Sequence, residues 1–185
     1  MARELITKFM ATHMPYIDPV EELDMTIEIR PFDERYTEEL LDLSLQAWAP
    51  VFEAMAKTND KFVLDAFYPN GWEVRQVADI KALLKDATCE VWAAHAKDSL
   101  VGFVGLRVHP EDKMGEIHIV AVAPEHQRRG VATALMSFAN DEFRRAGLKM
   151  VMVETGGDPG HEASRAAYES FGFRRWPVAR YFMEL

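Results

Sequence analysis

The residues from Val120 to Thr133 have the features of a site that binds an anion such as phosphate. A strand rich in β-branched residues closes at Pro124, and a short polar turn leads directly into a helix. The first N–H groups of a helix lack intrahelical partners and carry the positive end of its dipole, and phosphate oxygens satisfy both. Gly130 lets a ligand approach the backbone, and Arg128 and Arg129 can add charge-assisted hydrogen bonds. The pattern predicts a phosphate-binding turn.

Two motifs in this half of the chain resemble those of one enzyme family. Gln127-Arg128-Arg129-Gly130-Val131-Ala132 resembles the coenzyme-A motif of the GNAT acetyltransferases, Gln/Arg-x-x-Gly-x-Gly/Ala. Ala166-Ala167-Tyr168-Glu169-Ser170-Phe171-Gly172-Phe173 is similar to the family's C-terminal signature, in which a helix carrying tyrosine runs into Gly-Phe. One predicted strand separates the motifs, as in the family. The resemblance extends from about Thr26 to the C-terminus.

The resemblance implies a GNAT-like acyl-CoA N-acyltransferase fold with acetyl-CoA as co-substrate. In that fold the pantetheine arm runs between two splayed parallel strands, here Glu116–Val122 and Lys149–Glu154. His161 stands where many family members carry an asparagine that contacts the cofactor. The cofactor-binding residues that the resemblance implies are Val120, Ala121, Val122, Gln127, Arg128, Arg129, Gly130, Val131, Ala132, Thr133 and His161.

Acetylation of an amine needs an amine that has lost a proton, a carbonyl held at attack distance and a protonated leaving thiolate. Direct attack within a ternary complex gains mainly from positioning. By resemblance, Tyr168 is the general acid for the coenzyme-A sulfur, or a hydrogen-bond donor to it. A tyrosine pKa of about 10 suits donation rather than proton abstraction.

Glu116 is the favoured general base. It lies where acetyltransferases of the histone-modifying branch carry a glutamate in a similar Glu-Ile-x-x-x-Ala-Val segment. Strand alternation puts Glu116, His118 and Val120 on one face, so His118 could share the work through a water. Partial burial is expected to raise the pKa of the carboxyl, which helps a base near neutrality. Glu154 is an alternative base that could instead bind an amine.

The remaining pattern predicts the elements that position these residues. Strands are expected at Met25–Ile29, Cys89–Ala96, Leu100–Val108, Glu116–Val122, Lys149–Glu154 and Val178–Met183. Helices are expected from Asp33 to before Pro50, over Trp72–Lys85, over Gly130–Ala146 and around His161–Phe171. This order predicts an α/β mixed sheet with helices on both faces. Residues 1–24 are interpreted as an N-terminal arm and residues 25–185 as the domain.

Composition narrows the classes of partner. The formal net charge is −9, which argues against nonspecific nucleic-acid binding and favours a cationic acceptor such as an amine. Cys89 is the only cysteine, and the histidines lack metal-ligand spacing, so neither a disulfide nor a metal site is expected. The sequence shows neither a secretory signal nor an apolar run long enough for a membrane, which favours the cytoplasm. A homodimer is the common default for the oligomeric state, which the sequence leaves open.

The leading hypothesis is an acetyl-CoA-dependent N-acetyltransferase that acts on a small-molecule amine. The alternatives are a noncatalytic acetyl-CoA-binding sensor and an enzyme that acetylates protein N-termini or lysines. Aromatic residues cluster around the first two predicted helices, the acceptor side in the family, where they line an acceptor pocket or pack the core: Trp48, Phe52, Phe67, Tyr68 and Trp72. The identity of the acceptor stays open, because this fold serves many reaction partners.

Overall fold

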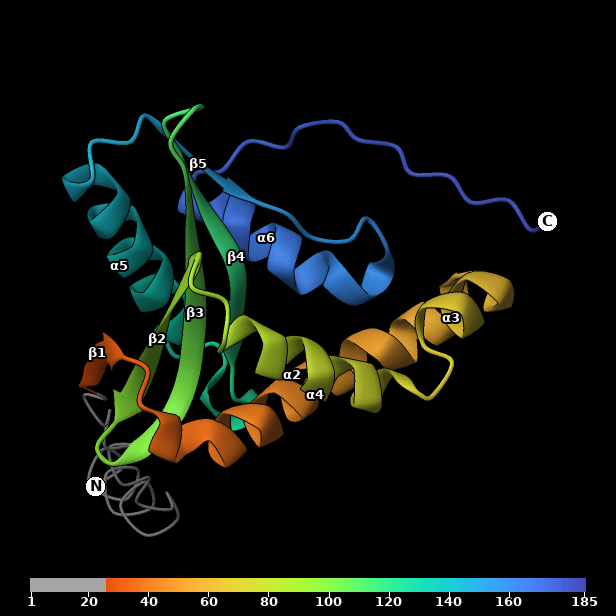
Figure 1. Ribbon diagram of the computed structural model, residues 1–185, viewed down its shortest axis with the longest axis horizontal. Helices are drawn as coiled ribbons and strands as arrows, with labels where there is room; N and C mark the ends of the chain where they lie inside the picture. The colour runs from red at the N-terminus through yellow and green to blue at the C-terminus, as the bar shows by residue number, and fades with distance from the viewer. Residues whose placement is uncertain (1–25) are drawn as a thin grey trace, which may run out of the picture.

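The computed structural model describes residues 26–185, and the predicted N-terminal arm lies outside the described residues. Its sheet has the order β1-β2-β3-β4-β5. All neighbouring strands are antiparallel except β4 and β5, which are parallel. The strands are β1 (Ile27–Pro31), β2 (Cys89–Ala96), β3 (Ser99–His109), β4 (Met114–Val122) and β5 (Met150–Val153). The predicted mixed sheet is confirmed (Figure 1).

Helices cover both faces of this sheet. The first half of α2 (Thr37–Thr58) and the end of α4 (Trp72–Leu83) bury leucine and isoleucine side chains against one face. On the other face, α5 (Val131–Arg145) buries Val131, Leu135, Met136, Ala139 and Phe143, and α6 (Glu162–Phe171) packs against the same cluster. Short 3-10 helices precede α2 (η1, Glu34–Tyr36), α5 (η2, Pro124–His126) and α6 (η3, Pro159–His161).

The helix predicted to stop before Pro50 continues to Thr58, so that boundary was wrong. Proline removes one intrahelical hydrogen bond. The apolar positions nevertheless continue beyond it at helical spacing, through Val51, Phe52 and Met55, and all three side chains are partly buried. After α2 comes a further short helix, α3 (Lys61–Phe67), which the sequence pattern did not indicate.

The α5 helix approaches the sheet closely at two glycines. A Cβ at Gly102 would lie 2.8 Å from the Ala121 carbonyl oxygen and 3.1 Å from Val131. A Cβ at Gly115 would overlap the ring of Phe143. The start of α5 therefore lies close to β3 at Gly102, and the end of α5 lies close to the start of β4 at Gly115.

The strand predicted at Val178–Met183 is not formed, because residues 173–185 adopt neither helix nor strand. They run from the end of α6 across the molecule toward the side of α3 (Figure 1), where the rings of Phe182 and Phe67 lie 5.6 Å apart. An alternating apolar pattern makes a strand only where a neighbouring strand accepts its hydrogen bonds. Among the described residues β5 therefore forms one edge of the sheet.

Candidate active site

The predicted anion-binding turn connects η2 to α5. The Gln127 side chain donates from Nε2 to the Val122 carbonyl oxygen at 3.2 Å, which ties the turn to the end of β4. Arg128 (φ +61°) and Gly130 (φ +83°) both adopt left-handed backbone conformations. This conformation is costly for arginine and readily adopted by glycine. The turn thus reverses the chain in a few residues and starts α5 next to the strand end.

The first turn of α5 is open to a ligand. No side chain caps the helix at Gly130, and a Cβ there would meet nothing within 4 Å. Arg128 and Arg129 are exposed, and within residues 26–185 neither side chain has a hydrogen-bond or ion-pair partner that would need to be displaced. Uncapped N–H groups, open space and two arginines are the arrangement that phosphate groups require.

The central strands β4 and β5 diverge above this turn. They pair only from Met114 to Ile117 on β4 and from Met150 to Val153 on β5. The rest of β4, to Val122, has its partner β3 on one side and no strand on the other among the described residues. Backbone groups along that edge are available to an extended ligand with amide groups, as the resemblance implied for pantetheine.

A bulge in β4 changes which residues share a face. Opposite Gly105 and Leu106 of β3 stand Ile119 and Ile117, so His118 is the extra residue. Ile117 packs on the α5 face, Ile119 on the α2 face and Val120 again on the α5 face. The prediction that Val120 shares a face with Glu116 and His118 is therefore wrong, because strict alternation fails at the bulge.

Glu116 lies at the centre of a polar cluster at this bulge. Its Oε2 is 2.7 Å from Nε2 of His109, and its Oε1 is 2.8 Å from Nδ1 of His118. Arg107 approaches the same His118 Nδ1 at 3.0 Å and donates from Nη2 to Asp86 at 2.7 Å. The Glu116 side chain is 15% exposed, whereas the two imidazoles are about one third exposed. Sequence reasoning missed His109. The register of β3 against β4 puts Arg107 opposite Glu116, so His109, two residues further along β3, is the diagonal neighbour of Glu116.

The two contacts of His118 Nδ1 exclude each other in any single protonation state. A protonated Nδ1 donates to Glu116 and offers no lone pair to Arg107; an unprotonated Nδ1 accepts from Arg107 and repels the carboxylate. Which contact forms depends on the tautomer of His118, and Glu116 and Arg107 compete for the same imidazole nitrogen.

Glu116 has a pKa below its ordinary value. Burial alone raises the pKa, but the hydrogen bonds and charges of His118 and His109 outweigh that effect. The expectation of a raised pKa was wrong because it counted desolvation and left out the two imidazoles. Glu116 is therefore an ionised carboxylate at neutral pH, in hydrogen-bond contact with two imidazoles.

Tyr168 approaches from α6, on the other side of the sheet. It packs in the α5-side cluster with Val153, and its ring lies 6.0 Å from that of Phe173. Burial raises its pKa to about 12. No described residue hydrogen-bonds its hydroxyl or joins it to the Glu116 cluster. The structure thus presents Tyr168 as a protonated donor separate from the carboxylate.

Two other predicted site residues lie beyond the end of β5. Glu154 is largely exposed, and its Oε1 accepts from Arg180 at 3.2 Å. His161 ends η3, with its Nδ1 2.8 Å from Asp158 Oδ2. Its side chain also faces a cavity beside α2, so the structure places it close to the predicted acceptor side.

That cavity lies among α2, α3 and α4 and has a volume of about 170 Å³. Phe52 stacks on Trp72 with ring centroids 4.5 Å apart and meets Tyr68 edge-on at 5.0 Å. Four of the five predicted aromatic residues line the cavity: Trp48, Phe52, Phe67 and Tyr68. The fifth, Trp72, does not line the cavity but stacks on the ring of Phe52.

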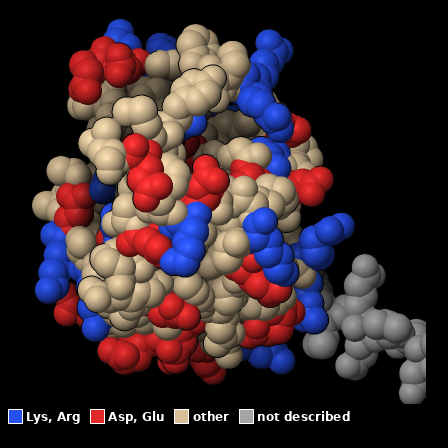
Figure 2. All heavy atoms as spheres, turned by 90° about the vertical axis from the view of Figure 1, so that its right-hand side faces the viewer, with Lys and Arg blue, Asp and Glu red and all other residues tan. Residues whose placement is uncertain are grey.

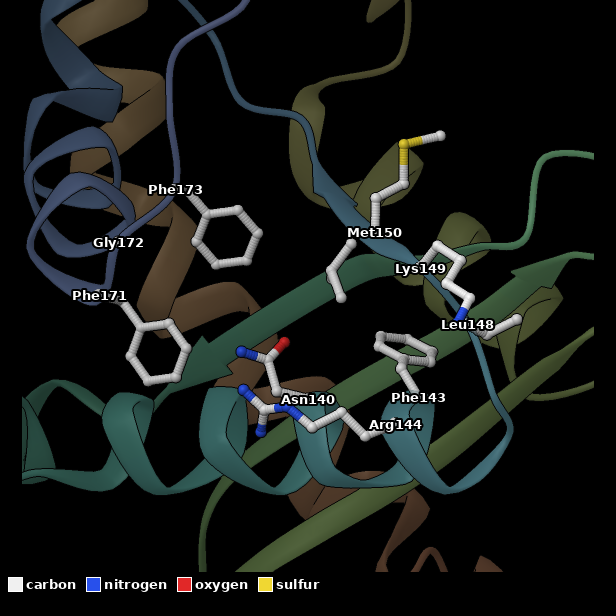
Figure 3. A pocket seen from close by; sticks show the side chains of 10 residues that line it. Asn140, Phe143, Arg144, Leu148, Lys149, Met150, Phe171, Gly172 and Phe173 are labelled. Atoms are coloured by element: carbon white, nitrogen blue, oxygen red, sulfur yellow. The ribbon is translucent and has the colours of Figure 1, made fainter.

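A larger cavity of about 280 Å³ lies elsewhere, between the end of α5, the start of β5 and the end of α6. Figure 3 shows Asn140 and Arg144 of α5 facing Phe171 and Phe173 across it. It contains none of the predicted site residues. Its position beside the paired start of β5, away from the divergent strand ends, separates it from the anion-binding turn.

Two negative findings concern residues 26–185. No group of three or more His, Cys, Asp or Glu side chains in this range is arranged to hold a metal ion. None of the helices in this range is both long and apolar enough to cross a bilayer.

The mixed sheet, the divergent parallel strands and the open helix N-terminus are together the features of the acyl-CoA N-acyltransferase fold that the sequence resemblance implied. Residues 61–173 match the Acetyltransferase (GNAT) family, and the chain belongs to that family.

Comparisons with individual proteins agree with this family. The mycothiol acetyltransferase of Renibacterium salmoninarum is 27% identical over 143 residues, which cover 73% of this chain and 41% of that protein. The chain thus spans about two fifths of the length of this curated relative. The PaiA N-acetyltransferase of Thermoplasma acidophilum, solved in complex with coenzyme A, has the same fold, with a TM-score of 0.62, 16% identity and coverage of 84% and 94% of the two chains. An aminoglycoside antibiotic 6'-N-acetyltransferase from Acinetobacter haemolyticus gives a TM-score of 0.61, 19% identity and coverage of 85% and 98%.

Proposed function

We propose that this protein transfers the acetyl group of acetyl-CoA directly to the primary amine of a small molecule. The observation that carries the proposal is the divergence of β4 and β5 above the uncapped start of α5. This arrangement offers backbone hydrogen bonds to an extended amide arm and an anion site to its phosphate end.

The turn supplies the cofactor site in this proposal. The N–H groups at the start of α5 bind pyrophosphate oxygens, and Arg128 and Arg129 add charge to a molecule that is otherwise strongly acidic. The Gln127 side chain holds the turn through Val122 and keeps the N–H groups aimed outward. The open edge of β4 from His118 to Val122 positions the arm beside the polar cluster.

Glu116 takes the proton from the attacking ammonium. A carboxylate with a lowered pKa is a weak base, but it is in hydrogen-bond contact with two imidazoles that reach solvent. An imidazole is the side chain that exchanges protons near neutrality. Glu116 therefore attracts the cation and passes the proton on to His109 or His118.

Tyr168 stabilises the leaving sulfur as a hydrogen-bond donor. Full proton transfer from a group of pKa about 12 to a thiolate of pKa ~8.5 would be uphill by about 5 kcal/mol. A retained hydrogen bond to the developing negative charge avoids that cost. Of the two roles that the resemblance implied, the pKa thus favours hydrogen-bond donation.

Two observations support a small-molecule acceptor. The aromatic cavity beside α2 has the size of a small-molecule group, and His161, from the segment that follows β5, is one of its lining residues. Acidic side chains gather along the lower edge of the face in Figure 2, on the side where Figure 1 places α2, and they attract cationic amines. A protein or peptide acceptor and a noncatalytic sensor are the alternatives.

Thermal unfolding with acetyl-CoA, with ATP as the control, tests the first half of the proposal. A ligand at about 100 times its dissociation constant stabilises the fold by roughly 2.7 kcal/mol. A dose-dependent rise of Tm with acetyl-CoA alone, followed by amine-dependent thiol release, is the expected result. Binding without transfer to any amine or peptide would favour the sensor, and transfer to peptides alone would favour a protein substrate.

A further inference from the structure

The cavity beside α2 is built to hold one aromatic ring. Its volume is about 170 Å³, and a cavity of about 150 Å³ lined by apolar side chains holds benzene. Four aromatic side chains and the aliphatic side chains of Val51 and Met55 form most of its wall. Aromatic walls favour an aromatic guest through stacked and edge-to-face contacts.

Three polar side chains of the cavity wall, those of Arg75, Gln76 and Asp79, already have partners. Arg75 pairs with Asp79 through Nε at 3.0 Å and donates to the Phe67 carbonyl oxygen at 3.2 Å. The Gln76 amide donates to Ser44 Oγ at 2.8 Å. An apolar ring can therefore enter without breaking the contacts of these three side chains, and the Tyr68 hydroxyl, which no described residue hydrogen-bonds, is left to face a polar substituent or solvent.

Two of the residues that line the cavity connect it with the elements of the proposed reaction centre. Trp48, in its wall, packs against the same core cluster as Ile119, which lies in the unpaired half of β4. His161, on the opposite wall, belongs to the segment that follows β5. The η3 turn lies directly on α2, because a Cβ at Gly160 would sit 2.7 Å from the Val51 carbonyl oxygen. The segment that leaves β5 therefore forms part of the cavity wall.

We infer that the acceptor is a primary amine carrying a single six-membered aromatic ring on a short linker. The ring occupies the cavity among α2, α3 and α4, and the amine extends toward Glu116. This inference rests on the proposed function and adds the substrate class to it. Because a cavity of similar volume holds benzene, a larger fused ring is expected to fit less well.

The test compares 2-phenylethylamine, ethylamine and 2-(1-naphthyl)ethylamine as acceptors, using thiol release with saturating acetyl-CoA. Burial of a phenyl group contributes enough free energy for a preference in kcat/KM of about tenfold to hundredfold over ethylamine. The naphthyl compound should fall well below 2-phenylethylamine. Equal values for the three amines would overturn the inference and leave the acetyltransferase proposal intact.

Three variants localise the effect. V51F fills the cavity and should reduce the preference for 2-phenylethylamine to near that of ethylamine. F67A, at a ring that is already 41% exposed, widens the cavity and should raise activity with the naphthyl compound. W176A is the matched control, because Trp176 is 83% exposed and lies outside the cavity wall. Equal loss of preference in W176A and V51F would contradict the cavity assignment.

A binding measurement separates the two proposals if no amine is acetylated. Quenching of tryptophan fluorescence reports on the cavity, because Trp48 lines it and Trp72 lies behind Phe52. Saturable quenching by 2-phenylethylamine, absent with ethylamine and in V51F, would support the ring site while the transfer reaction fails. Absence of both quenching and ring preference would refute the inference.

Discussion

Replacing Tyr168 by phenylalanine removes one hydroxyl and should reduce turnover without weakening the fold. No described residue hydrogen-bonds that hydroxyl, so its loss breaks no internal hydrogen bond, and the ring keeps its packing against the α5-side core cluster and its contact with Phe173. A hydrogen bond to a charged group contributes about 1.5–3 kcal/mol. If the bond forms mainly in the transition state, kcat should fall by about tenfold to 150-fold.

The assay measures kcat and the KM of acetyl-CoA for Y168F by thiol release, with Tm recorded in parallel. The KM of acetyl-CoA and the Tm should be unchanged. Y181F is the matched control, because the Tyr181 side chain is 88% exposed, and it should retain full activity. A kcat within twofold of the wild-type value would remove Tyr168 from the reaction.

The pH profile tests the reasoning about Tyr168 independently. Because burial raises its pKa to about 12, Tyr168 stays protonated through the working range. Wild type and Y168F should therefore show the same alkaline limb below about pH 11. An alkaline limb near pH 9 that disappears in Y168F would show that the tyrosine ionises much earlier than its burial indicates.

The remaining predictions concern Glu116 and the turn. E116Q should lower kcat at neutral pH. Because the pKa of Glu116 is lowered in the folded protein, its ionised form should stabilise the fold above pH ~4.5, and this stabilisation should be lost as the pH falls below that value. The difference in Tm between wild type and E116Q, measured across pH, checks this. H109Q removes one of the interactions that lower this pKa, so the acid limb of activity should move to higher pH; an unmoved limb would exclude the coupling. G130A places a Cβ at φ +83° and should cost roughly 1–2 kcal/mol, seen as a Tm lower by several degrees, and it should raise the KM of acetyl-CoA. R128A and R129A should each raise that KM by a factor that shrinks at high salt, whereas a salt-independent effect would point to a structural role.

The periodic parts of the fold were predictable from the sequence, and the positions of its interruptions were not. The α5 helix repeats apolar residues at helical spacing, and the structure places them against the sheet as expected. Pro50 was read as a stop, but the apolar stripe of α2 continues on both sides of it. The tail pattern at Val178–Met183 was read as a strand, although pattern alone does not supply a neighbour.

The candidate site shows the same division between local signals and cross-strand geometry. The turn before α5 is local, because its glycine and polar residues are contiguous, and its predicted form is confirmed. The contact between His109 and Glu116 depends on the register of β3 against β4. The bulge at His118 shifts that register by one residue, and no periodicity in the sequence marks it.

The proposed base and the proposed hydrogen-bond donor lie on opposite faces of one sheet, and the geometry at the bulge allows both to contact one ligand. Glu116 points to the α2 face, because its neighbours Gly115 and Ile117 both face α5. Tyr168 packs on the α5 face. Side chains from opposite faces reach a common ligand only where no backbone separates them, and among the described residues that condition is met where β5 leaves β4 after Ile117. The bulge follows Ile117 immediately, so the strand changes its alternation at the point where its partner departs. The divergence therefore has two consequences, since it frees backbone groups to bind a ligand and lets both faces of the sheet contact it.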